Sequence, residues 1–185
     1  MNNNKPDPSA LPDVIRSLPE LLAWRVAATP QAEAYRQFDA QRKSWVSWSW
    51  AAFGERVALW SRALGRLALP RGARVAILLP NSMDAVSIDQ AVLAQACVPV
   101  PLHAIDNPAS IAYILADSEA SVLVASTLEQ WQAIAALGQP LPQLREVVLR
   151  DLAPGQTVES APVPVPVLAL ADWLARAEAA APAAP

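Results

Sequence analysis

The chain has 185 residues, of which 54% are hydrophobic and 17% are charged, and its formal net charge at pH 7 is −3. This length predicts one domain with a buried core, and the weak acidic charge argues against a nucleic-acid-binding surface. One cysteine and one histidine exclude an internal disulfide and a histidine-rich metal site. Since neither a secretory signal nor an apolar run of bilayer length is visible, we expect a cytoplasmic protein.

The first part of the chain predicts a helix, a β-hairpin and a second helix. Residues 1–12 are rich in Asn and Pro and are expected to be disordered. Apolar residues over 18–28 indicate a helix that ends at Thr29-Pro30. Segments 33–38 and 44–50 flank a polar turn, which is typical of an antiparallel hairpin. Ser49 is then expected to cap a helix with one apolar face, made of Phe53, Val57, Trp60, Leu64 and Leu67.

The remainder of the chain alternates strands with helices. The continuous apolar run at 75–79 predicts a strand covered on both faces, and the next strand is expected at 98–102. Between them, Asn81 is expected to cap a helix over 82–96, so the two strands should be parallel. The same unit then recurs. Its expected strands are 121–125, 146–149 and 167–170, and its expected helices are 109–116 after Asn107-Pro108, a helix to 137 capped by Ser126 or Thr127, and 172–180.

This alternation predicts an α/β fold, in which helices flank a parallel sheet and a small antiparallel hairpin is attached. We expect a single subdomain over residues 13–180, followed by an Ala- and Pro-rich tail at 181–185. In open parallel sheets ligands bind beyond the carboxyl ends of the strands, and the loops at 80–82 and 103–107 occupy that position. Asn81 and His103 are the polar candidates there, although a helix cap and a loop imidazole bonded to backbone or water are the plainer interpretations.

Catalytic residues and metal ligands are not expected within this chain. The glycines are too widely spaced for either common phosphate-binding pattern. Asp84 and Asp89 lie five residues apart on a helix and therefore diverge in direction. Cys97 has no neighbouring histidine in the sequence, which favours a buried structural thiol. These residues predict a scaffold without a catalytic centre of its own.

Two long segments carry a family resemblance. "SWSWAAFGERVALWSRAL" and "RVAILLPNSMDAVSIDQAVLAQACVPVPLHAIDNPASIAYILADSEASVLVAS" resemble the N-terminal part of the AMP-forming acyl-CoA synthetases. Their superfamily includes peptide-synthetase adenylation domains and firefly luciferase. "AQACVPVPLHAID" is similar to a family motif written around Gly-Ala-x-x-Val-Pro-Leu, with Gln95-Ala96-Cys97 where a glycine is common. The opening "LPELLAWRVAATPQAEAYRQFD" most resembles the long-chain fatty-acid branch, and the likeness covers roughly residues 14–178.

The resemblance implies a two-step reaction that uses ATP, Mg²⁺ and coenzyme A to convert a fatty acid into an acyl-adenylate and then a thioester. The family's phosphate loop, ribose-binding aspartate and catalytic lysine have no counterpart here, so we expect an N-terminal fragment that is inactive alone. The resemblance further implies that the subdomain lies beside the acyl tunnel, with Asn81 and His103 as substrate-side residues. It leaves open whether the chain makes homodimer or peripheral membrane contacts. A short-chain, aryl or amino-acid adenylating enzyme and a non-catalytic interaction module are the alternatives.

Overall fold

The computed structural model describes residues 15–103, 105–156, 158 and 163–179. The tails expected at 1–12 and 181–185 lie outside these residues. Contacts within the chain group it into two compact units, 1–57 and 58–185. The boundary falls inside a helix. The single subdomain expected over 13–180 stays a prediction. Within the described residues, no helix is both long enough and apolar enough to span a bilayer.

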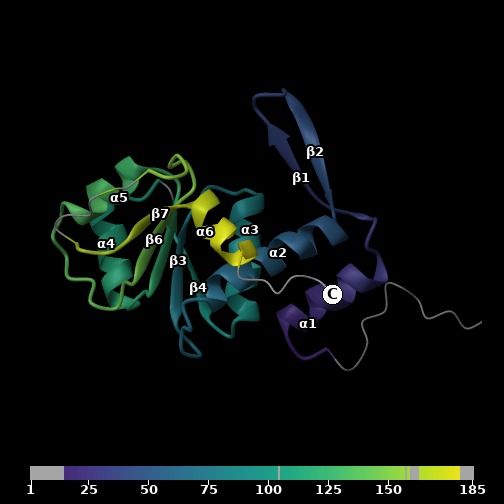
Figure 1. The fold of residues 1–185 in the computed structure, drawn as a ribbon, viewed down its shortest axis with the longest axis horizontal. Coiled ribbons are helices and arrows are strands. Elements are labelled where there is room, and N and C mark those ends of the chain that lie inside the picture. The colour runs from purple at the N-terminus through teal and green to yellow at the C-terminus, as the bar shows by residue number, and fades with distance from the viewer. Residues whose placement is uncertain (1–14, 104, 157, 159–162, 180–185) are drawn as a thin grey trace, which may run out of the picture. The chain divides into compact units, whose positions relative to one another are not determined.

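The first unit contains the predicted helix and hairpin. Ser17 begins α1 (Leu18–Ala28) with a capping box, in which its Oγ accepts a hydrogen bond from the N–H of Glu20. β1 (Glu33–Asp39) and β2 (Ser44–Ser49) pair antiparallel (Figure 1). α2 (Trp50–Gly65) follows directly, and the Ser49 hydroxyl accepts from the N–H of Ala52 at 3.2 Å, which confirms the predicted cap.

One face of the hairpin packs against the start of α2. The Tyr35 ring lies 4.7 Å from the Phe53 ring and 6.1 Å from the Trp50 ring, measured between centroids. The Arg56 guanidinium lies over the Trp48 ring at 5.8 Å. These contacts use the β1 and β2 residues of one face only, because successive side chains along a strand alternate between faces. The opposite face of the hairpin, which we call the outer face, takes no part in these contacts with α2.

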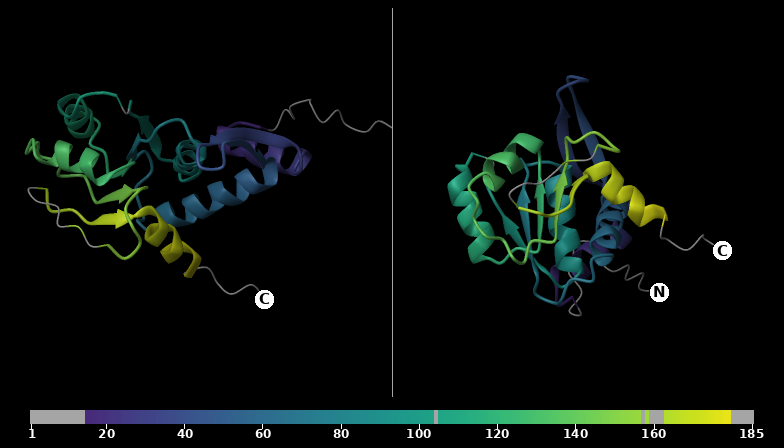
Figure 2. Two further views of the ribbon diagram at one scale, coloured as in Figure 1. Left: turned by 90° about the horizontal axis from the view of Figure 1, so that it is seen from above. Right: turned by 60° about the vertical axis from the view of Figure 1, so that its left-hand side comes forward.

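The second unit is built on a five-stranded parallel sheet with the strand order β4-β3-β5-β6-β7 (Figures 1 and 2). The predicted parallel pairing of β3 with β4, joined by one helix, is confirmed. The elements of this unit after α2 are β3 (Arg74–Leu78), α3 (Met83–Ala94), β4 (Val98–Pro101), α4 (Pro108–Asp117), β5 (Val122–Ala125), α5 (Leu128–Ala135), β6 (Glu146–Leu149), β7 (Val167–Ala169) and α6 (Leu170–Ala179).

Helices cover both faces of this sheet, as predicted. Figure 1 shows α4 and α5 on one side and α3 and α6 on the other. The side chains of β5 are all buried, because it is the central strand and has a helical layer on each face. On the α4–α5 side the core is formed by Leu78, Leu123, Leu149, Leu115 and Trp131, among others. In α6, Trp173 meets Trp60 of α2 edge to face, with ring centroids 5.8 Å apart.

The C-terminus of α3 differs from the prediction, because the helix ends at Ala94 rather than at residue 96. Ala96 adopts a left-handed conformation with φ of 53°, and its N–H donates to the carbonyl of Leu93. The N–H of Cys97 donates to the carbonyl of Val92, so the pair of bonds forms a Schellman motif. Cys97 is buried, as predicted, and burial raises the pKa of its thiol.

β4 is an edge strand with an unusual composition. The N–H of Val98 donates to the carbonyl of Ala73, and the N–H of Leu102 donates to the carbonyl of Ile77, each at 2.9 Å. Backbone direction alternates along a strand, so Pro99 and Pro101 lie out of phase with these donors. Proline therefore occupies the positions of β4 that face away from β3.

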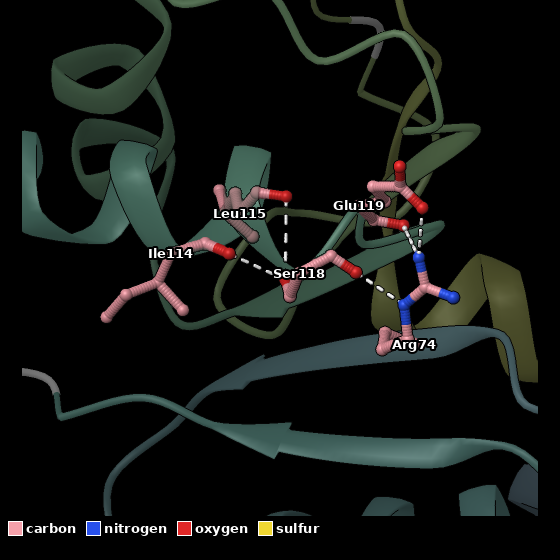
Figure 3. A network of polar contacts seen from close by, with 5 residues as sticks. All are labelled: Arg74, Ile114, Leu115, Ser118 and Glu119. Atoms are coloured by element: carbon pink, nitrogen blue, oxygen red, sulfur yellow. Dashed lines mark hydrogen bonds and ion pairs between the residues drawn. The ribbon is translucent and has the colours of Figure 1, made fainter.

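A polar network holds the amino end of β3 to the turn after α4 (Figure 3). The Arg74 guanidinium donates to the Glu119 carboxylate at 2.6 Å and to the carbonyl of Ser118. The Ser118 hydroxyl donates to the carbonyl of Ile114, also at 2.6 Å. Arg74 thus provides a donor for a carbonyl at the C-terminal end of α4, where helices leave carbonyl groups without helical partners. We interpret this network as structural.

Candidate functional site

The carboxyl edge of the parallel sheet is the candidate functional site, because this is where ligands bind in sheets of this kind. Four strands of the sheet, β3 to β6, end at this edge in polar residues before the next element begins. β7 differs, since it continues directly into α6. The polar residues at this edge are Asn81 and Ser82 after β3, His103 after β4, Ser126 and Thr127 after β5, and Arg150 and Asp151 after β6.

Asn81 does not cap α3, which corrects the sequence prediction. Ser82 is the N-cap residue, and its Oγ accepts from the N–H of Ala85 at 3.2 Å. Both Asn and Ser are favoured caps, but Pro80 and Asn81 remain outside the helix, so the second of the two polar residues takes the role. Asn81 is exposed just before the helix, and its side chain makes no hydrogen bond with any described residue.

His103 follows β4, the neighbour of β3 in the sheet, so its loop and that of Asn81 lie at the same edge. The carbonyl of His103 accepts from the N–H of Asp106 at 3.0 Å in a turn. Its imidazole is exposed, and within the described part of the chain it has no hydrogen-bonding partner. Both sequence candidates are therefore accessible polar groups on adjacent loops, and their role in binding substrate stays a prediction.

Ser126 was predicted from the sequence only as a possible helix cap. Thr127 is the N-cap of α5 instead, with a capping box completed by Gln130. Ser126 is 5% exposed, and its hydroxyl has no hydrogen-bonding partner among the described residues. Its backbone is held on both sides, because its N–H donates to Gln130 Oε1 and its carbonyl accepts from the N–H of Asp151. The edge thus contains a buried, unpaired hydroxyl at the end of the central strand.

A charged group adjoins it at the end of β6. The Arg150 guanidinium donates to both oxygens of Asp151, at 2.7 and 2.9 Å. These bonds lower the pKa of the Asp151 carboxyl and raise the pKa of Arg150, to which the nearby charge of Asp84 also contributes. Asp151 binds the guanidinium and the charge of Asp84 acts on it, so the three side chains together carry a net negative charge. It is therefore unsuited to binding a phosphate on its own.

The signal that identifies Ser126, Arg150 and Asp151 was present in the sequence. All three follow strands whose apolar runs were predicted correctly, so the carboxyl-edge rule that selected Asn81 and His103 would have selected them as well. The influence of Asp84 on Arg150 was harder to predict from the sequence, since the two residues are far apart in the chain and come near each other only through the order of the strands in the sheet.

Within the part of the chain that the structure describes, neither a set of metal ligands nor the cavity found there lies at the carboxyl edge. Among the described residues, no group of three His, Cys, Asp or Glu side chains is placed to hold a metal ion. A cavity of about 370 Å³ is lined by the segments that precede β6 and β7, which places it at the amino edge of the sheet. Its lining is mainly proline, leucine and valine, with Gln139 as the one polar side chain. Nothing in it offers acid–base or nucleophilic chemistry.

Comparisons with known proteins agree with this architecture. The profile of the AMP-binding enzyme family matches residues 22–182. A long-chain-fatty-acid–CoA ligase, FadD15 of Mycobacterium bovis, is 30% identical over 104 residues, which is 56% of this chain and 17% of the ligase. The Mycobacterium tuberculosis counterpart matches equally. The chain therefore matches about a sixth of the length of these relatives.

Solved structures extend the fold comparison to nearly all of the chain. A fatty acyl CoA synthetase of Mycobacterium tuberculosis superposes with a TM-score of 0.68 at 22% identity, covering 90% of this chain and 30% of that protein. The anthranilate CoA ligase AuaEII, in complex with anthranoyl-AMP, superposes with a TM-score of 0.71 at 19% identity, covering 92% and 30% respectively. At these identities the superpositions establish the fold alone.

Proposed function

The chain belongs to the AMP-binding enzyme family, and from that premise we propose that it forms the N-terminal portion of an ATP-dependent fatty-acid–CoA ligase. The observation that carries the substrate class is the match to the long-chain-fatty-acid–CoA ligase, since it reaches 30% identity across 104 residues. The proposed reaction has two steps. The fatty-acid carboxylate attacks the α-phosphate of ATP to give an acyl-adenylate and pyrophosphate, and coenzyme A then displaces AMP to form the thioester.

The first step brings an anionic carboxylate to an anionic triphosphate, so the active site must supply cations and backbone donors. Mg²⁺ supplies part of that charge in phosphoryl chemistry of this kind. The described residues do not fit such an ion, because Asp151 is already paired with the Arg150 guanidinium and no group of three candidate ligands is found among them. We propose that the nucleotide and the metal are bound by other parts of the enzyme, and that these 185 residues alone are inactive.

We propose that this chain contributes to binding the acid substrate. Asn81 and His103 are exposed polar groups on adjacent loops at the carboxyl edge, and each can donate a hydrogen bond to a carboxylate or a bound water. Such contacts position a substrate without taking part in the chemical step. In a longer, active polypeptide that continues through the family's phosphate loop, Asn81→Ala or His103→Ala should then raise KM for the acid about two- to tenfold, the worth of one hydrogen bond, while leaving kcat nearly unchanged. The matched control is Arg71→Ala, since Arg71 is an exposed residue just before β3 at the opposite edge of the sheet.

The deciding experiment measures acid-dependent ATP–pyrophosphate exchange. The 185-residue chain should show none, and a longer polypeptide that continues through the family's phosphate loop should show exchange with a long-chain fatty acid. An aromatic acid and a short-chain acid serve as competing substrates. Preferred exchange with either one would replace the fatty-acid assignment with another adenylating activity. Absence of exchange with every acid in the longer polypeptide would favour a non-catalytic interaction module.

A further inference from the structure

The outer face of the hairpin carries two exposed aromatic side chains. In the register of β1 and β2, Phe38 pairs with Trp45, so both point to the same face. Tyr35 belongs to the opposite face, which packs against α2. Trp45 is 65% exposed and Phe38 is 50% exposed, and their rings meet edge to face at 5.6 Å. The pair therefore forms a small apolar surface that no described residue covers.

Positive charge lies beside this surface. The turn between the strands contains Arg42 and Lys43, and the side chain of Arg42 is 75% exposed although it pairs with Asp39 at 3.6 Å. Lys43 forms no ion pair with a described residue. From Glu33 to Ser49 the hairpin has three basic and two acidic residues, whereas the whole chain has a net charge of −3. Arg36 pairs with Glu33 and Arg42 with Asp39, so the excess positive charge of the hairpin comes from Lys43 in the turn.

The turn is preorganised. Asp39 Oδ1 accepts hydrogen bonds from the N–H groups of Gln41 at 2.9 Å and Arg42 at 3.0 Å, which closes the turn locally. Since the backbone is already fixed, binding through this turn has a small ordering cost.

We propose that the tip of the hairpin, with Phe38 and Trp45 on its outer face and Arg42 and Lys43 in the adjoining turn, binds the surface of an anionic lipid bilayer. Tryptophan favours the membrane–water interface, and basic side chains next to it are attracted to anionic lipid headgroups. A second copy of the chain fits less well, because pairing two such faces would bring their basic residues together. Two aromatic side chains and a few charges predict weak, reversible binding. This proposal rests on the hairpin and not on the ligase activity.

Co-sedimentation of the 185-residue chain with vesicles tests the proposal. Binding should be stronger to phosphatidylcholine vesicles that contain phosphatidylglycerol than to phosphatidylcholine alone, and it should weaken with salt. Trp45→Ser should lower the partition coefficient about tenfold, and Lys43→Gln about fivefold. Tyr113→Ser is the matched control, because Tyr113 on α4 is also 65% exposed, and it should leave binding unchanged.

A second readout locates the contact. Trp45 is the one exposed tryptophan of the seven in the chain, so brominated lipids should quench its fluorescence on binding. Trp45→Leu should keep most of the binding but lose that quenching. Equal binding to neutral and anionic vesicles, quenching that persists in Trp45→Leu, or an equal loss in Tyr113→Ser would each overturn the proposal. So would a dimer that dissociates in Trp45→Ser with no vesicle binding in the original chain.

Discussion

Replacement of Ala96 by glycine should stabilise the second unit. Ala96 occupies the C′ position of the Schellman motif at the end of α3, with φ of 53°. A left-handed conformation costs an L-residue about 1–2 kcal/mol, and glycine adopts it without that cost. Glycine loses about 0.5–1 kcal/mol more in backbone entropy on folding. Because the Ala96 side chain is exposed, its removal uncovers no apolar surface. The net gain should be about 0.5–1 kcal/mol.

Urea denaturation followed by circular dichroism measures this gain directly, and a thermal melt should show a Tm increase of about 1–4 °C for a chain of this length. Ala133→Gly is the matched control, since Ala133 is also exposed but lies inside α5 with helical geometry. It should lose about 1 kcal/mol. The two substitutions are chemically identical and should have opposite signs. A destabilised Ala96→Gly variant would refute the assignment of a left-handed cap at this position.

Three further changes test the core and the candidate site. Ser126→Ala should raise the free energy of unfolding by about 1 kcal/mol in urea denaturation, because it removes a buried hydroxyl without a described partner. Ser87→Ala should give no such gain in the same assay, since the Ser87 hydroxyl donates to the carbonyl of Met83 at 2.6 Å. Leu123→Ala, in the central strand, should cost about 2–5 kcal/mol in the same assay, and a cost below 1 kcal/mol would contradict its fully buried position. The Asp151 carboxyl has a pKa lowered below its ordinary value of 3.8, so its stabilising contribution is present above that value and is lost as the pH falls through the folded-state pKa. Asp151→Asn should therefore lose less stability than the original chain between pH 6 and pH 3 in thermal melts, and an unchanged acid sensitivity would count against the Arg150 pairing.

The sheet was predictable because β3, β5 and β6 are short apolar runs buried on both faces, a pattern that few other structures produce. Helix ends were harder. Asn81 and Ser82 are adjacent and nearly equal as caps, so residue type alone could not choose between them. Gln95 and Ala96 suit a helix, but the turn into β4 ends α3 before them. That turn depends on where the next strand must begin, which is a tertiary constraint.

The candidate site was predictable by position and not by chemistry. The loops that contain Asn81 and His103 do lie at the carboxyl edge. The burial of the Ser126 hydroxyl and the approach of Asp84 to Arg150 depend on side-chain packing between elements that are distant in the sequence. No local pattern carries that information, so these features became visible only in three dimensions.

The two prolines of β4 determine how this sheet can meet other molecules. A strand added to a sheet edge needs outward N–H groups to donate to it, and Pro99 and Pro101 have none. At the opposite edge, β7 has only three residues, Val167–Ala169, which gives little length for pairing. Neither edge is therefore suited to continuing the sheet into a second chain. A homodimer formed through this sheet would therefore have to use side-chain surfaces instead of strand pairing, and the same two edges resist the runaway strand pairing that leads to fibrous aggregates.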